Sequence, residues 1–94
     1  MHLHELIRGI DCTVMSQDNP DISDILIDSR KVSPGSLFVC IPGAKADGHT
    51  FAADAARQGA AAVVAERALS DVDVPQILVR DSREALSLLA ASFH

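Results

Sequence analysis

Two glycines bracket a segment whose backbone could bind an anion. The run Gly43-Ala44-Lys45-Ala46-Asp47-Gly48 lies between a predicted strand and a predicted helix, where phosphate-binding loops occur. A nucleotide-hydrolysing loop also needs Lys and then Ser or Thr after its second glycine, whereas this chain has His49 and Thr50. ATP hydrolysis is therefore not predicted here. Two interpretations remain, a tight turn or a loop in which the amides of Ala44, Lys45 and Ala46 bind a polar ligand.

The polar triplet Asp28-Ser29-Arg30 is the second candidate, because it ends a short β-branched run at Ile25-Leu26-Ile27. As a strand cap, Asp28 and Ser29 would bond nearby amides and Arg30 would lie in water. As a site, this strand end would share one cleft with the 42–49 loop, provided that the two strands are adjacent and parallel. The connection between them has only about nine residues, so an antiparallel pair is also possible.

The remaining reactive side chains form no catalytic or metal-binding set. His2 and His4 lie at a chain end and are expected in water, while Cys12, Cys40 and His49 lack the spacing of metal ligands. Cys40 lies within an apolar run and is predicted to be a small buried hydrophobic residue. We therefore predict no catalytic residue, no metal site and no cofactor for this chain.

The elements that must position these residues are short apolar runs alternating with helical patterns. We predict strands over residues 25–27, 37–41, 61–65 and 76–79, with a further edge strand over 12–15. Helices are predicted over 3–8, from Thr50 as N-cap to Gln58, and from Asp81 as N-cap onward. Because the strands show no polar alternation, the predicted fold class is α/β, a small mixed, mostly parallel sheet with helices on both faces.

Composition excludes several classes of protein. The 94 residues are 48% apolar with a net charge of −5, which predicts one domain over residues 1–94 in the cytoplasm. Eight basic against thirteen acidic residues, without Trp or Tyr, argue against nucleic acid, and no apolar run reaches the ~18 residues of a membrane span. The last predicted helix runs to His94 without a stop signal, so we expect a domain cut from a longer chain.

These motifs together resemble the N-terminal domain of the Mur ligases of peptidoglycan synthesis. The resemblance covers nearly the whole chain and is greatest to the MurE branch, with MurF as the near neighbour. It rests on Asp28-Ser29-Arg30 followed by Val32, Pro34-Gly35 and Leu37-Phe38-Val39, then Gly43, Asp47-Gly48-His49 and Phe51, and on Gly59-Ala60, Ala62-Val63-Val64, Glu66, Leu3-His4-Glu5-Leu6-Ile7 and Asp81-Ser82-Arg83-Glu84-Ala85-Leu86.

The resemblance implies a domain that binds the uridine end of UDP-N-acetylmuramoyl-L-alanyl-D-glutamate, through Ile27 and Ser29 at the strand end and through Ala44, Lys45 and Ala46 in the loop. It implies ATP and Mg²⁺ only for a full-length ligase, whose central and C-terminal domains would be this domain's partners. The chain has no G-T-x-G-K-T nucleotide loop, so we expect it to be inactive alone. Alternatives are the MurF domain and a free-standing α/β interaction module that binds no nucleotide.

Overall fold

Five short strands form one sheet in the computed structural model, which describes residues 1–43 and 45–93. The sheet order is β1-β5-β4-β3-β2, where β2 to β5 are parallel and β1 pairs antiparallel with β5. The mixed, mostly parallel sheet and its edge strand are therefore confirmed. The strands are β1 (Thr13–Val14), β2 (Asp24–Leu26), β3 (Ser36–Val39), β4 (Ala62–Ala65) and β5 (Gln76–Leu78).

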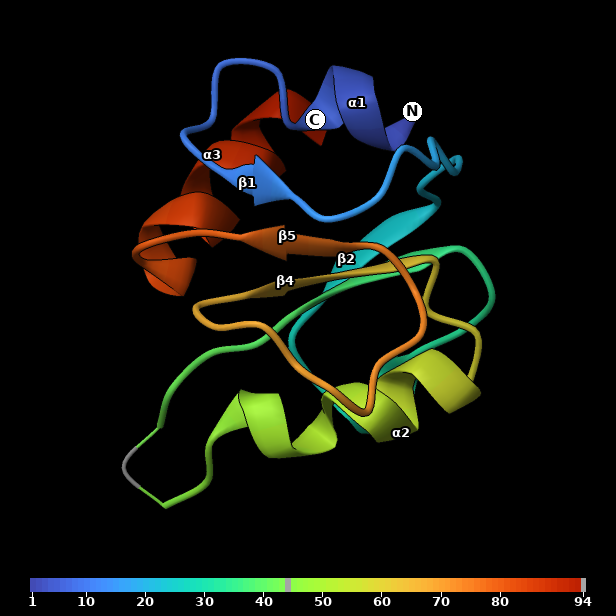
Figure 1. Ribbon diagram of the computed structural model, residues 1–94, viewed down its shortest axis with the longest axis vertical. Helices are drawn as coiled ribbons and strands as arrows, with labels where there is room; N and C mark the ends of the chain where they lie inside the picture. Colours follow the sequence, from blue (N-terminus) through green and yellow to red (C-terminus); the bar gives the residue numbers. More distant parts are fainter. Residues whose placement is uncertain (44, 94) are drawn as a thin grey trace.

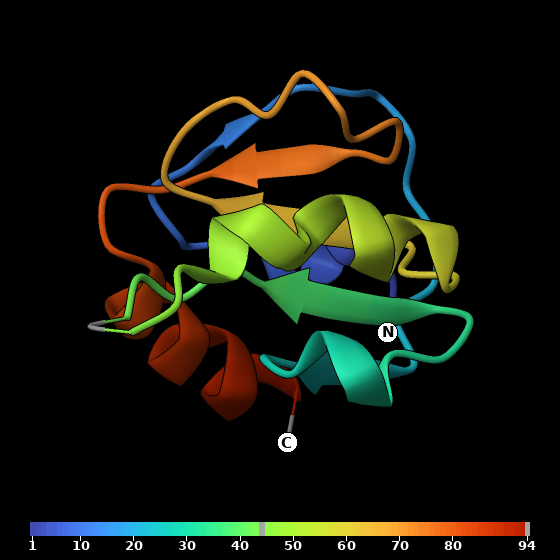
Figure 2. The same cartoon turned by 90° about the horizontal axis from the view of Figure 1, so that it is seen from below.

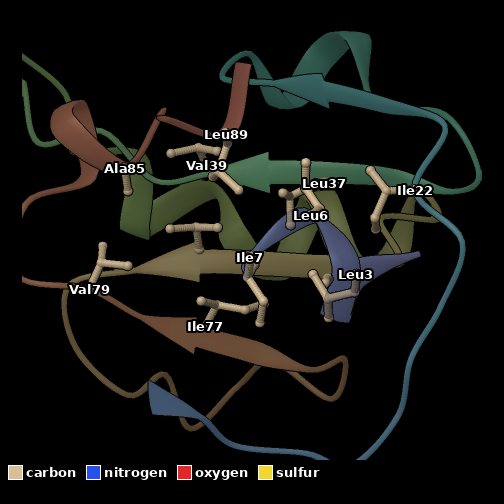
Figure 3. Close-up of a cluster of buried hydrophobic side chains, with 12 residues drawn as sticks. Leu3, Leu6, Ile7, Ile22, Leu37, Val39, Ile77, Val79, Ala85 and Leu89 are labelled. Atoms are coloured by element: carbon tan, nitrogen blue, oxygen red, sulfur yellow. The ribbon is translucent and has the colours of Figure 1, made fainter. Parts of the chain in front are cut away.

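Both faces of the central strands β3 and β4 are buried, which explains their unbroken apolar sequence. Leu37 and Val39 point into one hydrophobic cluster, while Phe38 and Cys40 point into the other. Figure 3 shows the first cluster, in which Leu6 of the N-terminal helix lies over β3 and β4.

Helices cover the two faces as the sequence predicts. Helices α1 (Leu3–Leu6) and α3 (Ser82–Phe93) lie on one side of the sheet, and α2 (Ala52–Arg57) lies on the other (Figure 1). Two 3₁₀ turns, η1 (Ser29–Lys31) and η2 (Gly48–Phe51), precede β3 and α2. Within the described part of the chain no helix combines the length and the apolar character needed to cross a bilayer.

The predicted start of the second helix is wrong. Thr50 is not the N-cap of α2, because the 3₁₀ turn η2 begins two residues before Thr50. Asp47 caps this turn, and its carboxylate accepts the His49 N–H at 3.0 Å. The Thr50 hydroxyl instead donates to the Asp47 carbonyl at 2.7 Å. Aspartate is a better N-cap than threonine, and Asp47 directly precedes the 3₁₀ turn with which this helical segment begins. The predicted cap of α3 is confirmed, since the Asp81 carboxylate accepts the N–H groups of Arg83 and Glu84.

Strands β2 and β3 are parallel, which resolves the alternative that their short connection left open. Leu26 lies beside Phe38, and the nine residues 27–35 make the crossover. A single 3₁₀ turn, η1, takes the place of the longer helix usual in such units. Gly35 then turns the chain into β3 with φ +91°, a conformation that favours glycine.

Candidate functional site

The carboxyl ends of four parallel strands meet at one edge of the sheet. Their common direction is visible in Figure 2, where the arrows of β3 and β5 point to the same side. The segments that follow these strands carry most of the polar residues singled out in the sequence. This edge is where open parallel sheets usually bind ligands.

A depression of about 510 Å³ lies beside the end of β2. Two large apolar side chains border it and remain in contact with solvent, since Ile27 is 54% exposed and Phe51 is 40% exposed. Asp28, Ser29 and Arg30 complete its lining. The depression therefore combines apolar surface with hydrogen-bonding groups, as sites for small molecules do.

Asp28 and Arg30 form a small ion pair at this depression. The Asp28 carboxylate accepts the Arg30 backbone N–H at 3.0 Å and two guanidinium N–H groups at 3.1 and 3.0 Å. These hydrogen bonds lower the pKa of Asp28 to about 2, and the bonds from the Arg30 side chain contribute more than the bond from its backbone N–H. The Arg30 side chain is 87% exposed, so the pair contributes little to stability but keeps both charges at the rim.

The loop after β3 is held by a buried histidine. His49 accepts the Glu66 N–H through Nε2 at 2.9 Å, and its Nδ1 lies 2.7 Å from an Asp47 carboxylate oxygen. An acceptor Nε2 carries no proton, so Nδ1 carries it and donates to Asp47. The backbone and ring N–H groups of His49 lower the pKa of Asp47, with a smaller contribution from Arg67 at 3.5 Å.

Two further contacts extend these links across the edge. The Glu66 carboxylate accepts the Ser82 N–H at 2.8 Å, which joins the end of β4 to the start of α3. The Arg83 guanidinium donates to the Pro42 carbonyl, which joins α3 to the loop after β3. Three successive strand ends are thus connected by side chains into one unit.

The structure brings together part of the predicted site. Ile27 and Ser29 line the depression, whereas Lys45 and Ala46 are exposed in the loop after β3, at the same edge but outside that lining. Ala44 lies outside the described residues. Sequence reasoning did not assign Phe51 to the site. The signal that could have found it is a single large aromatic residue directly before an alanine-rich helix.

The triplet 28–30 combines the two interpretations that the sequence left open. Asp28 caps η1 in the structural role, and the same residues line the depression. Cys40 is completely buried as predicted, and burial raises the pKa of its thiol to about 12. It is therefore a neutral core side chain and not a nucleophile.

The edge does not fit the ATP and Mg²⁺ that the resemblance implies for a full-length enzyme. Over residues 1–43 and 45–93, no three His, Cys, Asp or Glu side chains gather closely enough to hold a metal ion. In the loop after β3 the residue that follows the second glycine is His49, where a phosphate-binding loop needs a lysine, and its imidazole is already bonded to Asp47 and to the Glu66 N–H. No step of nucleotide chemistry follows from these residues.

A family model and a set of curated proteins both match the sequence of this chain. A family model described as "Mur ligase family, catalytic domain" matches residues 21–94. The UDP-N-acetylmuramoyl-L-alanyl-D-glutamate–2,6-diaminopimelate ligases of Bacillus cereus and Listeria monocytogenes serotype 4b are 50% and 47% identical over 95 residues. These alignments cover 100% of this chain and 19% of each relative.

Solved structures share the fold. A crystal structure of MurF from Acinetobacter baumannii superimposes with a TM-score of 0.83 at 30% sequence identity, covering 95% of this chain and 20% of that one. A MurF ligase from Thermotoga maritima, solved with ADP, gives 0.65 at 37% identity over 71% of this chain and 16% of that one. The chain thus spans about a fifth of the length of the curated relatives it matches.

Proposed function

The chain belongs to the Mur ligase family and has the fold of its N-terminal domain, and from this premise we propose that it anchors the substrate of a MurE-type ligase. In this proposal the whole enzyme is cytoplasmic, uses ATP and Mg²⁺, and adds the third amino acid to UDP-N-acetylmuramoyl-L-alanyl-D-glutamate. The curated relatives are named for 2,6-diaminopimelate, and we propose the same amino acid here. Bond formation belongs to the central and C-terminal domains of that enzyme.

Sequence identity favours MurE over MurF. The diaminopimelate ligases are 47% and 50% identical to the whole chain, whereas the Acinetobacter baumannii MurF is 30% identical over 95% of it. The MurF superposition reflects a fold that the two branches share. We therefore propose the MurE role and retain MurF as the alternative within the family.

The observation that carries the proposal is the depression beside β2. A uracil ring has two apolar faces and a polar edge, which match the exposed Ile27 and Phe51 side chains and the hydroxyl of Ser29. Arg30 at the rim uses two of its guanidinium N–H groups on Asp28, and its other N–H groups could donate to a phosphate oxygen. In this proposal Lys45, Ala46 and Ala44 contact the same ligand from the neighbouring loop, mostly through backbone groups.

The expected affinity for the uridine end alone is low. Two or three neutral hydrogen bonds contribute about 1 kcal/mol each, and stacking on one aromatic ring contributes about 1 to 3 kcal/mol. Association costs several kcal/mol. The balance leaves little net free energy, so we expect a Kd on the order of 1 mM at best, and most of the substrate affinity of the whole enzyme would come from other parts of the ligand.

The test is a titration of ¹⁵N-labelled chain with UDP. We expect the amides of residues 27–30 and Phe51 to shift together in the millimolar range. Phe51→Ala should weaken binding about 5- to 100-fold, the effect of losing one stacked base. Met15→Ala is the matched control, because Met15 is also a large exposed apolar residue, 53% exposed, but lies outside the depression. If millimolar UDP shifts neither segment, the proposed site is wrong.

The coding sequence beyond residue 94 provides an independent test. A nucleotide-binding loop of the G-T-x-G-K-T type within about 20 codons would support a ligase. A stop codon there would favour the free-standing interaction module.

A further inference from the structure

We propose that His49 is the positioning residue of the uridine site, and that its neutral imidazole holds Phe51 and Asp47, at the end of the loop after β3, in the arrangement that binds the ligand. The proposal deepens the proposed function and rests on it. It concerns a buried titratable side chain that does not line the depression and that no sequence pattern assigns to a site.

The burial and bonding of His49 suit this role. The residue is 5% exposed, and both of its ring nitrogens have partners on different segments. One partner, Asp47, lies in the loop after β3 and the other, Glu66, at the end of β4. Because the Glu66 partner is a backbone N–H with a fixed direction, the ring accepts through Nε2 only when that nitrogen is unprotonated.

His49 and Phe51 belong to the same 3₁₀ turn. In η2 the histidine faces inward and is buried, while Phe51, two residues later, is exposed at the depression. Fixing the imidazole between Asp47 and Glu66 therefore fixes the turn that presents the aromatic ring. Gly48, the residue before His49, packs so closely on the end of β3 that a Cβ would lie 2.6 Å from the Ile41 nitrogen, which leaves the turn little freedom to shift.

The same contacts fix the loop that carries Lys45 and Ala46. Its amino-terminal end is held at Pro42 by Arg83, and its carboxyl-terminal end at Asp47 by His49 and Arg67. Both contacts at Asp47 reach the segment after β4, the first through the hydrogen bond from the Glu66 N–H to the His49 ring and the second through Arg67 itself. Loss of the imidazole would remove both ring hydrogen bonds from this end of the loop, while the contacts of Arg83, Arg67 and the Gly48 N–H remained.

The first measurement is the ring tautomer of His49 in the unmodified 94-residue chain. Long-range ¹H–¹⁵N correlation should give a protonated Nδ1 and an unprotonated Nε2 at neutral pH. The amide hydrogen of Glu66, which bonds to Nε2, should exchange slowly. A protonated Nε2 at neutral pH would overturn the proposal, because the bridge to β4 could not then exist.

The second measurement compares variants in UDP titration. His49→Leu removes both ring hydrogen bonds, His49→Gln can keep an acceptor for the Glu66 N–H, and His49→Asn can keep a donor to Asp47. We expect His49→Leu to weaken UDP binding about five- to tenfold and to shift the amides of Phe51 and Ala46 before any ligand is added. His49→Gln should recover part of the affinity.

A matched control separates positioning from general stability. Ile22→Val removes one methylene from a side chain that is 1% exposed in the cluster beneath α1, on the other face of the sheet. It should lower the melting temperature without changing UDP affinity. If His49→Leu remains folded and binds UDP as the unmodified chain does, the positioning role is wrong while the uridine site stands. If the unmodified chain does not bind UDP, the proposed function is wrong, and the positioning role of His49 is wrong as well because it rests on that function.

Discussion

Gly48→Ala should be costly for a purely steric reason. The added Cβ would lie 2.6 Å from the Ile41 nitrogen and 3.1 Å from both the Cys40 Cα and the Ile41 oxygen. These are backbone atoms of the segment leaving β3, so no side-chain rotation relieves the clash. Ordinary contact requires about 3.4 Å or more, and the turn must therefore move by about 0.8 Å.

Such a movement would break a specific hydrogen bond. Gly48 donates its N–H to the Ile41 carbonyl at 2.9 Å, and a shift of that size takes the pair beyond hydrogen-bonding range. Losing the bond costs about 1 kcal/mol and overpacking about 1 to 3 kcal/mol, so we expect a destabilisation of about 2 to 4 kcal/mol. For a domain of this size, that lowers the melting temperature by roughly 8 to 30 °C.

The assay is urea unfolding monitored by circular dichroism, with Gly9→Ala as the comparison. Gly9 has φ +86°, and no atom lies within 4 Å of the position that its Cβ would take, so alanine there meets backbone strain alone, about 1 to 2 kcal/mol. Gly48→Ala should cost more and should also move the amides of Glu66 and Ala46, which Gly9→Ala should leave in place. A cost below about 1 kcal/mol at Gly48 would refute the steric reasoning.

Three further outcomes follow from the strand ends. The ¹³C-detected titration of the Asp28 carboxylate should have its midpoint near pH 2, and Arg30→Met should raise that midpoint toward 3.8. Because the pKa of Asp28 is lower in the folded chain than in the unfolded chain, the ionised carboxylate stabilises the fold above pH 3.8, and this stabilisation is lost as the pH falls toward 2. A midpoint near 3.8 in the unmodified chain would contradict the ion pair. Cys40 should resist a thiol reagent at pH 8 until the chain unfolds, since its pKa is about 12, and reaction in the native state at the rate of a free thiol would show that it is not buried. Ser29→Ala should weaken UDP binding about fivefold, equivalent to about 1 kcal/mol, with an unchanged melting temperature, whereas unfolding without any loss of affinity would return Ser29 to a purely structural role.

The sequence predicted the central strands and the class of fold well because these depend on local patterns. The apolar runs of β3 and β4 are long enough to identify and are bounded by glycine, proline or charged residues. The direction of β2 relative to β3 could not be predicted, because one 3₁₀ turn makes the crossover and the usual minimum length for a parallel connection does not hold here.

The candidate site was predicted less completely, for a different reason. Ile27 and Ser29 follow directly from the strand end, whereas Phe51 reaches the depression from a turn more than 20 positions later in the chain. The bridge from His49 to Glu66 joins residues 17 positions apart. No local spacing specifies such a pair, since it depends on β3 and β4 lying side by side.

The pairing of β1 with β5 has a consequence for the order of folding. Thr13 and Leu78 are 65 positions apart, whereas the parallel neighbours Val64 and Ile77 are 13 apart. Closing the longer loop costs about 1.4 kcal/mol more in chain entropy, so the N-terminal segment should dock last, onto a sheet that has already assembled. During synthesis this segment leaves the ribosome before its partner strand β5, and until the two pair the apolar face that α1 covers is open to other chains.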